Sequence, residues 1–135
     1  MSSDFDDDLD GLPYDEQSAS GETPEPHFSN VYVFVEDFLS KVYARPVRAQ
    51  ASWRWCPQWW AHPEAVSRLE ALWQAFEALR LDPGLGPATW WRDYADPTMG
   101  ALSDPAGTFA ACSDKGHQVP PDLPVERPAD WLLDR

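Results

Sequence analysis

The amino-acid sequence predicts a mainly α-helical fold, a small domain of three to four helices. Two segments carry apolar side chains at helical spacing, residues 31–42 and residues 65–79. Tryptophan is the third indication, because six of the eight in this 135-residue chain lie in two short blocks. Each large aromatic ring buries roughly 150–250 Å². A few helices can therefore enclose a dense core.

The first expected helix covers residues 31–42, where apolar side chains recur at intervals of three and four. Ser29 and Asn30 directly before it are good N-cap residues. Valines at alternate positions near its start also permit a strand, but the length of the apolar stripe favours a helix.

The second expected helix begins at Pro63, a residue suited to the first helical position, and ends near residues 81–84, Leu-Asp-Pro-Gly. A third, short helix is expected over residues 89–95, because Pro97 should break it. Residues 99–102 can form one more turn. Residues 107–113 fit a short strand or a loop equally well.

Composition divides the chain into three parts. Residues 1–27 carry nine acidic side chains and no Lys or Arg, so we expect a disordered acidic arm. Residues 28–118 form the helical Trp-rich domain. Residues 119–135 form a Pro-rich C-terminal tail that favours extended backbone. This tail ends in a short apolar segment, residues 129–133, which we expect can dock on the domain.

The formal net charge of −13 argues against broad binding to phosphate backbones, which requires clustered Lys and Arg. The sequence has neither the long apolar run of a transmembrane helix nor the basic start and apolar stretch of a secretory signal. We therefore expect a cytoplasmic protein without membrane contact. Its two cysteines are then free thiols or metal ligands rather than a disulfide.

The tryptophan-rich block at residues 53–60 permits two interpretations. Its rings can build the core, or some can form a stacking surface for nucleic-acid bases or sugars. A local run of cations without an intervening acid accompanies the block. Adjacent Trp59 and Trp60 cannot point in one direction on a regular element, so one of them should be exposed. The predicted partner or nucleic-acid surface comprises Lys41, Arg45, Arg48, Arg54, Trp59 and Trp60.

A metal site is the second hypothesis from residue types. Cys56 and His62 form one Cys/His pair, and Cys112 and His117 form another. Two thiolates and two imidazoles are a ligand set of closed, structural zinc sites. The spacing differs from that of familiar zinc fingers. Two buried thiols with unrelated histidines therefore remain the alternative.

Sequence motifs for catalysis are not found. The chain has no Gly-rich phosphate loop, no nucleophile elbow and no His-Glu-x-x-His helix. A zinc ion with four protein ligands would also leave no open position for a substrate. We therefore predict that the protein is not an enzyme and has no small-molecule substrate.

Four segments together resemble an uncharacterised domain family found in actinobacteria, their phages and their conjugative or integrative elements. They are residues 55–65 (WCPQWWAHPEA), 68–73 (RLEALW), 90–93 (WWRD) and 107–117 (GTFAAC to GH). The resemblance covers about residues 31–117 and implies no activity and no catalytic residue. It implies an actinobacterial or phage host and a mobile-element setting. All four candidate ligands lie inside the matching segments.

These observations lead to three functional hypotheses. The first is a non-catalytic protein-interaction module encoded by a mobile element or phage, with DNA transfer or replication as its setting. The second is a zinc-stabilised accessory protein that binds nucleic acid through the cationic residues. The third is an acidic inhibitor of a host DNA-binding or defence protein, in which the arm mimics nucleic acid.

Overall fold

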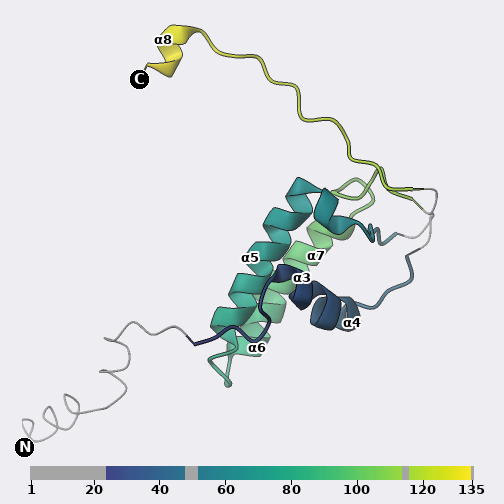
Figure 1. Ribbon diagram of the computed structural model, residues 1–135, viewed down its shortest axis with the longest axis vertical. Coiled ribbons are helices and arrows are strands. Elements are labelled where there is room, and N and C mark those ends of the chain that lie inside the picture. Colours follow the sequence, from purple (N-terminus) through teal and green to yellow (C-terminus); the bar gives the residue numbers. More distant parts are fainter. Residues whose placement is uncertain (1–23, 48–51, 114–115, 135) are drawn as a thin grey trace, which may run out of the picture.

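The computed structural model describes residues 24–47, 52–113 and 116–134 and is mainly helical, with no strand among those residues (Figure 1). The predicted fold class is therefore confirmed. Most of the acidic arm predicted at residues 1–27 lies outside the described part of the chain, as does Arg48. Where the chain is described, no helix combines the length and the apolar character needed to cross a bilayer.

The first helical run matches the expected span. It consists of α3 (Val31–Phe34), the π-helical stretch η1 (Val35–Leu39) and α4 (Ser40–Val42), which follow one another without a break. Asn30 caps its start, because the side-chain oxygen accepts a hydrogen bond from the backbone N–H of Val33. The helical reading of this segment is thus correct.

The second helix, α5 (Pro63–Leu79), begins at the proline that the sequence indicated. A single turn of 3₁₀ helix, η2 (Trp59–Ala61), leads into it, and His62 joins the two. Ala65, Leu69 and Leu72 on its apolar face are buried. Because α5 contacts the first helical run and the helices that follow it, it is the central element of the domain.

The third helical run is longer than predicted. α6 (Gly86–Thr89), the π-helical η3 (Trp90–Ala95) and α7 (Asp96–Ser103) are continuous, so the expected break at Pro97 is wrong. The backbone N–H of Asp96 donates to the carbonyl of Trp91, five residues back. This wider turn gives the proline ring room where a regular α-helix would clash.

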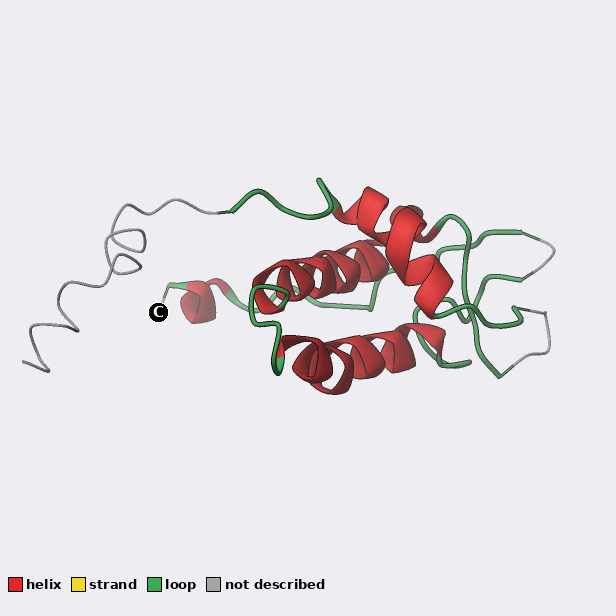
Figure 2. Cartoon of the chain, turned by 90° about the horizontal axis from the view of Figure 1, so that it is seen from below, coloured by secondary structure: helices red, strands yellow, loops and turns green. Residues whose placement is uncertain are grey.

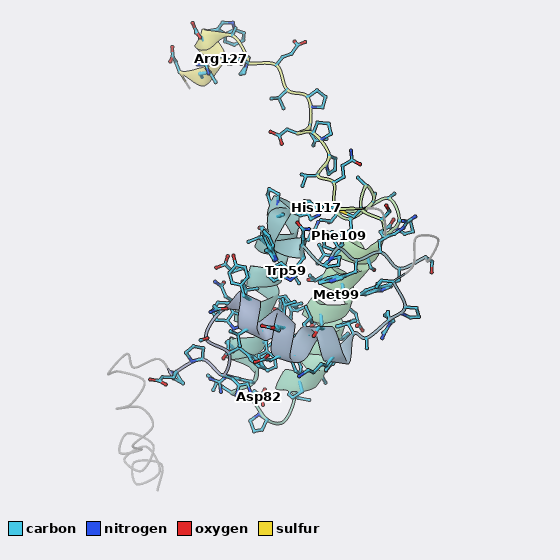
Figure 3. All side chains as sticks on the ribbon, turned by 45° about the vertical axis from the view of Figure 1, so that its right-hand side comes forward. Trp59, Asp82, Met99, Phe109, His117 and Arg127 are labelled. Carbon is cyan, nitrogen blue, oxygen red and sulfur yellow. The ribbon has the colours of Figure 1, made fainter. Side chains whose placement is uncertain are left out.

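The three helical runs enclose an aromatic core. Figure 2 shows α5 and the α6–α7 run lying side by side, with the first run packed across them. The rings of Phe34, Phe38, Phe76 and Trp90 contact one another at centroid distances of 5.1–6.3 Å. Trp90 is buried, and its indole N–H donates to the carbonyl of Leu72. Figure 3 shows how densely side chains fill the space between the helices.

Two irregular segments complete the described chain. Residues 104–113 form turns that return toward the start of α5, and an isolated bridge joins Ser113 to Gly116. The open choice between strand and loop for this region is thus decided in favour of a loop. Beyond it the tail runs in an extended conformation to α8 (Asp130–Leu133), which stands apart from the domain (Figure 1). The expected docking of this apolar segment on its own domain is not observed.

Candidate metal centre

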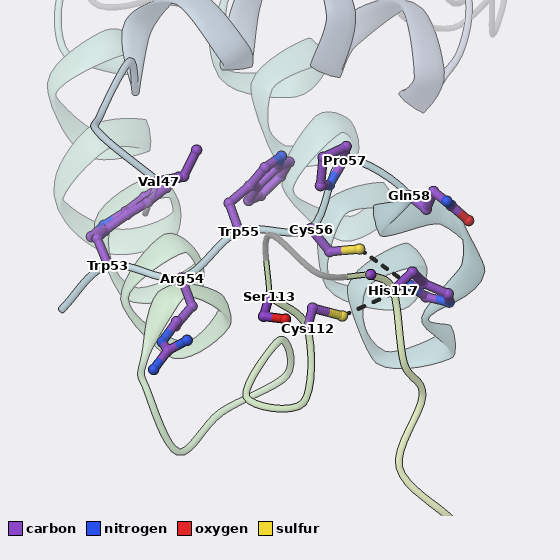
Figure 4. A pocket seen from close by; sticks show the side chains of 11 residues that line it. Val47, Trp53, Arg54, Trp55, Cys56, Pro57, Gln58, Cys112, Ser113 and His117 are labelled. Carbon is purple, nitrogen blue, oxygen red and sulfur yellow. Dashed lines mark hydrogen bonds between the residues drawn. The ribbon is translucent and has the colours of Figure 1, made fainter. Parts of the chain in front are cut away.

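The four cysteine and histidine residues singled out from the sequence meet at one end of α5. The potential ligand atoms of Cys56, His62, Cys112 and His117 all lie within 4.8 Å of one another. Both cysteines and His62 are buried, and His117 is half-buried. Figure 4 shows the thiols of Cys56 and Cys112 pointing toward the imidazole of His117. This cluster could hold a metal ion.

The spacing of the ligand atoms suits a tetrahedral ion. His117 Nδ1 lies 3.2 Å from both Cys56 Sγ and His62 Nε2, and 3.8 Å from Cys112 Sγ. His62 Nε2 lies 3.3 Å from Cys112 Sγ. Zinc bonds of about 2.3 Å to sulfur and about 2.0–2.1 Å to nitrogen require tetrahedron edges of roughly 3.3–3.8 Å. These four edges are close to this size, and each residue presents one ligand atom to the cluster.

The start of α5 positions the first pair of ligands. His62 ends the 3₁₀ turn, where its backbone N–H donates to the carbonyl of Trp59, and it also precedes the first residue of α5. A proline restricts the residue before it to extended backbone. His62 precedes Pro63 and has this conformation, with φ −101° and ψ 114°. This rigid junction directs the imidazole toward Cys56, which lies in the loop before the turn.

A tight reversal of the chain positions the second pair. The backbone groups of Ser113 and Gly116 exchange two hydrogen bonds, which brings the chain back so that His117 faces Cys112. Gly116 has φ +151°, a conformation that side-chain-bearing residues rarely adopt. This backbone conformation lets the chain turn back between Cys112 and His117.

Burial affects the protonation of the metal-free cluster. It raises the pKa of the Cys56 thiol to about 11, and a hydrogen bond with Cys112 adds to this effect. Burial also lowers the pKa of His62, and the nearby His117 acts in the same direction. A divalent ion would instead favour the deprotonated thiolates, because two thiolates neutralise its charge. Burial therefore favours the uncharged forms of Cys56 and His62 in the metal-free cluster, and the loaded cluster would be neutral overall.

Comparison with protein families gives one match: a family model described as Domain of unknown function (DUF4913) covers residues 28–130. The chain is a member of the DUF4913 family. No curated protein and no solved structure matches it. The matched range of the DUF4913 domain includes all four clustered ligands, the three helical runs and the extended tail up to the start of α8.

The predicted partner surface of this DUF4913 domain is only partly assembled. Trp59 is 7% exposed and stacks on Tyr32, whereas Trp60 is 55% exposed, as expected for adjacent residues that point in different directions. Trp59 therefore belongs to the core rather than to a surface. Lys41 and Arg45 are exposed, but Arg54 is half-buried.

Two groups beside the cluster were not identified from the sequence. The ring of Phe109 packs edge-on against His62 at a centroid distance of 5.0 Å and is fully buried. The backbone N–H of Gln118 donates to Cys112 Sγ at 3.5 Å. Such outer contacts orient metal ligands and adjust their basicity. A backbone N–H leaves no signature in residue type. In the sequence, Phe109 was noted only as part of the segment Gly107-Thr108-Phe109, without a role beside the ligands.

Proposed function

We propose that this DUF4913 protein is a non-catalytic interaction module whose fold is closed by a structural zinc ion. The convergence of four buried or half-buried ligand atoms, two sulfurs and two nitrogens, carries the proposal. Zinc favours this donor set and a four-coordinate geometry. With all four positions taken by protein side chains, no coordination site remains for a substrate or an attacking water. The ion would then stabilise the structure and take no part in a reaction.

The ion would join parts of the chain that are far apart in sequence. Cys56 and His62 come from the segment before α5, whereas Cys112 and His117 come from the segment after α7. A bond between these segments closes the domain at the end opposite the aromatic core. Because a preformed site does not exist in the unfolded chain, the free energy of zinc binding contributes directly to folding.

The biological setting in this proposal is a mobile element or phage of an actinobacterium, with a role in DNA transfer or replication. It is supported only by the sequence resemblance. The proposed location is the cytoplasm, because reduced thiols are required for the site. Nucleic-acid binding is the second candidate. It has in its favour the exposed Lys41 and Arg45 on a stretch without acidic residues, but the half-buried Arg54 contributes less surface than predicted.

Zinc content and its dependence on single ligands test the proposal. Purified protein is expected to contain one zinc ion per chain, measured by elemental mass spectrometry. After chelation the protein should unfold at a lower temperature. The Cys112→Ser and His117→Ala variants should lose the ion. His27, the third histidine, lies outside the cluster, so the His27→Ala variant should retain it.

Cobalt substitution provides an independent readout of geometry. A tetrahedral site with two sulfur and two nitrogen ligands gives strong visible absorption and thiolate-to-cobalt charge-transfer bands. Metal-free protein that folds with unchanged stability, and a Cys112→Ser variant that melts like the wild type, would refute the structural-zinc proposal.

A further inference from the structure

A groove lined by aromatic rings lies beside the candidate metal centre. It encloses about 320 Å³ between the end of the first helical run and the segment that precedes Cys56. Its walls and floor are formed by Tyr43, Val47, Trp53, Trp55 and Met99. The rings of Trp53 and Trp55 are stacked at 6.3 Å, with an angle of 20° between their planes. Val47 is 51% exposed at the groove, so apolar surface remains open there.

The groove has a cationic rim. Arg45 lines it and places its guanidinium 5.6 Å from the centre of the Tyr43 ring. The sequence has no acidic residue between Asp37 and Glu64. Every residue that lines the groove, except Met99, comes from this stretch. Asp96, the nearby carboxylate, accepts a hydrogen bond from the Tyr43 hydroxyl. An aromatic groove with this charge suits an extended, proline-rich segment that also bears acidic side chains.

The chain itself carries such a segment. Residues 117–129 have no regular secondary structure and include four prolines, together with Asp122 and Glu126. Leu123 is 85% exposed and Val125 is 88% exposed, so these apolar side chains are without a packing partner in the isolated chain. The family match includes this segment, so it belongs to the same unit as the groove.

The stiffness of the tail decides which groove it can reach. A polyproline-II segment advances about 3.1 Å per residue and resists bending over several residues. The tail starts at His117, and a hollow lined by His117 shares Val47, Trp53 and Trp55 with the groove. To enter its own groove, the tail would have to reverse direction within the few residues around Pro120 and Pro121. Instead it leads away from the domain (Figure 1).

We propose that the aromatic groove binds the proline-rich tail, residues 119–129, of a second copy of this chain. Reciprocal exchange of tails between two copies makes a closed, two-fold symmetric dimer. In this dimer Leu123 and Val125 are buried against Trp53, Trp55 and Val47, and the acidic side chains of the tail lie near Arg45. This interaction does not depend on the proposed metal, although both are found at the same end of the domain.

Sedimentation equilibrium of the full chain in the presence of zinc tests the exchange. The wild type is expected to have twice the 15.3 kDa mass of one chain and to dissociate on dilution. The tail variant Leu123→Asp and the groove variants Val47→Asp and Arg45→Glu should each be monomeric. Leu85→Asp is the matched control, because Leu85 is 71% exposed but lies at the start of α6, so this variant should remain a dimer.

Mixing the defective variants distinguishes tail exchange from other contacts. Leu123→Asp retains an intact groove and Val47→Asp retains an intact tail, so an equimolar mixture should form a heterodimer through one junction. A wild type that is monomeric at every concentration would overturn the proposal. A dimer that survives the tail and groove variants, or a mixture that stays monomeric, would do the same. Circular dichroism confirms that each variant is folded.

Discussion

At the scale of single residues, Glu77 ties the beginning of the described chain to α5. Its carboxylate accepts hydrogen bonds from the backbone N–H groups of His27 and Phe28 at 2.7 and 2.9 Å. It also pairs with Arg80 at 2.7 Å, and Arg80 in turn donates to the carbonyl of Glu25. The folded contacts therefore begin slightly before residue 28, where composition had placed the domain boundary.

These contacts predict a pH-dependent contribution to stability. Burial opposes ionisation of Glu77, but the hydrogen bonds from Phe28, His27 and Arg80 together outweigh it and lower the pKa of the carboxyl. A lowered carboxyl pKa in the folded state contributes stability that is present above the unfolded value, about 4.3, and is lost as the pH falls through the folded value.

The Glu77→Gln variant should therefore lose about 1–3 kcal/mol of unfolding free energy at neutral pH. The difference from the wild type should shrink as the pH falls below about 4. Urea denaturation at several pH values measures both effects. Glu70→Gln is the control, because Glu70 lies on the same helix and is exposed. Equal losses for the two variants would contradict the assigned role of Glu77.

At the scale of elements, the junction between α5 and α6 depends on a close backbone approach. A Cβ atom built on Gly86 would lie 1.9 Å from the carbonyl oxygen of Leu79, so no side chain fits there. Gly100 in α7 is different, because an added Cβ would meet no atom within 4 Å. Substitution by alanine should therefore have opposite effects on stability at the two glycines.

The Gly86→Ala variant should be destabilised by about 1–3 kcal/mol, because the helix end of α5 must shift. Gly100→Ala should be stabilised by about 0.5–1 kcal/mol, because alanine reduces the entropy lost in forming a helix. Thermal and urea unfolding of both variants provide the comparison. Similar melting temperatures for the two variants would rule out the close approach at Gly86.

At the scale of the whole molecule, two different centres hold the helices together. The aromatic core joins the first helical run to the later turns of α5 and to Trp90. The candidate metal centre joins the loops at the beginning of α5. His62 in the first centre and Phe76 in the second are separated along α5 by roughly 20 Å, given a rise of 1.5 Å per residue.

Removal of the proposed zinc ion should therefore loosen one end of the domain more than the other. After chelation, amide hydrogen exchange is expected to become faster at residues 54–62 and 107–113. Exchange should change little around Trp90 and the second half of α5, where the aromatic core supplies the packing. Uniform acceleration throughout the domain would show instead that the two centres unfold as one cooperative unit.

The sequence by itself determined the helical class, the start of α5 and the identity of the four candidate ligands. These follow from local chemistry: apolar spacing, the preference of proline for a first helical position, and the small set of residues that bind zinc. Asn30 likewise has the capping role that its residue type indicated.

Only the tertiary structure decided which of these groups meet. The sequence could not show that Cys56 and His117, 61 residues apart, bring their ligand atoms to 3.2 Å, because the packing of α5 against the other helices sets that distance. The expected break at Pro97 was wrong because the π-helical turn η3, which precedes the proline, begins at Trp90, and this ring packs in the aromatic core. The choice between Trp59 and Trp60 for burial depended on the 3₁₀ turn that orients them. Each of these outcomes depends on long-range packing, which local residue preferences do not determine.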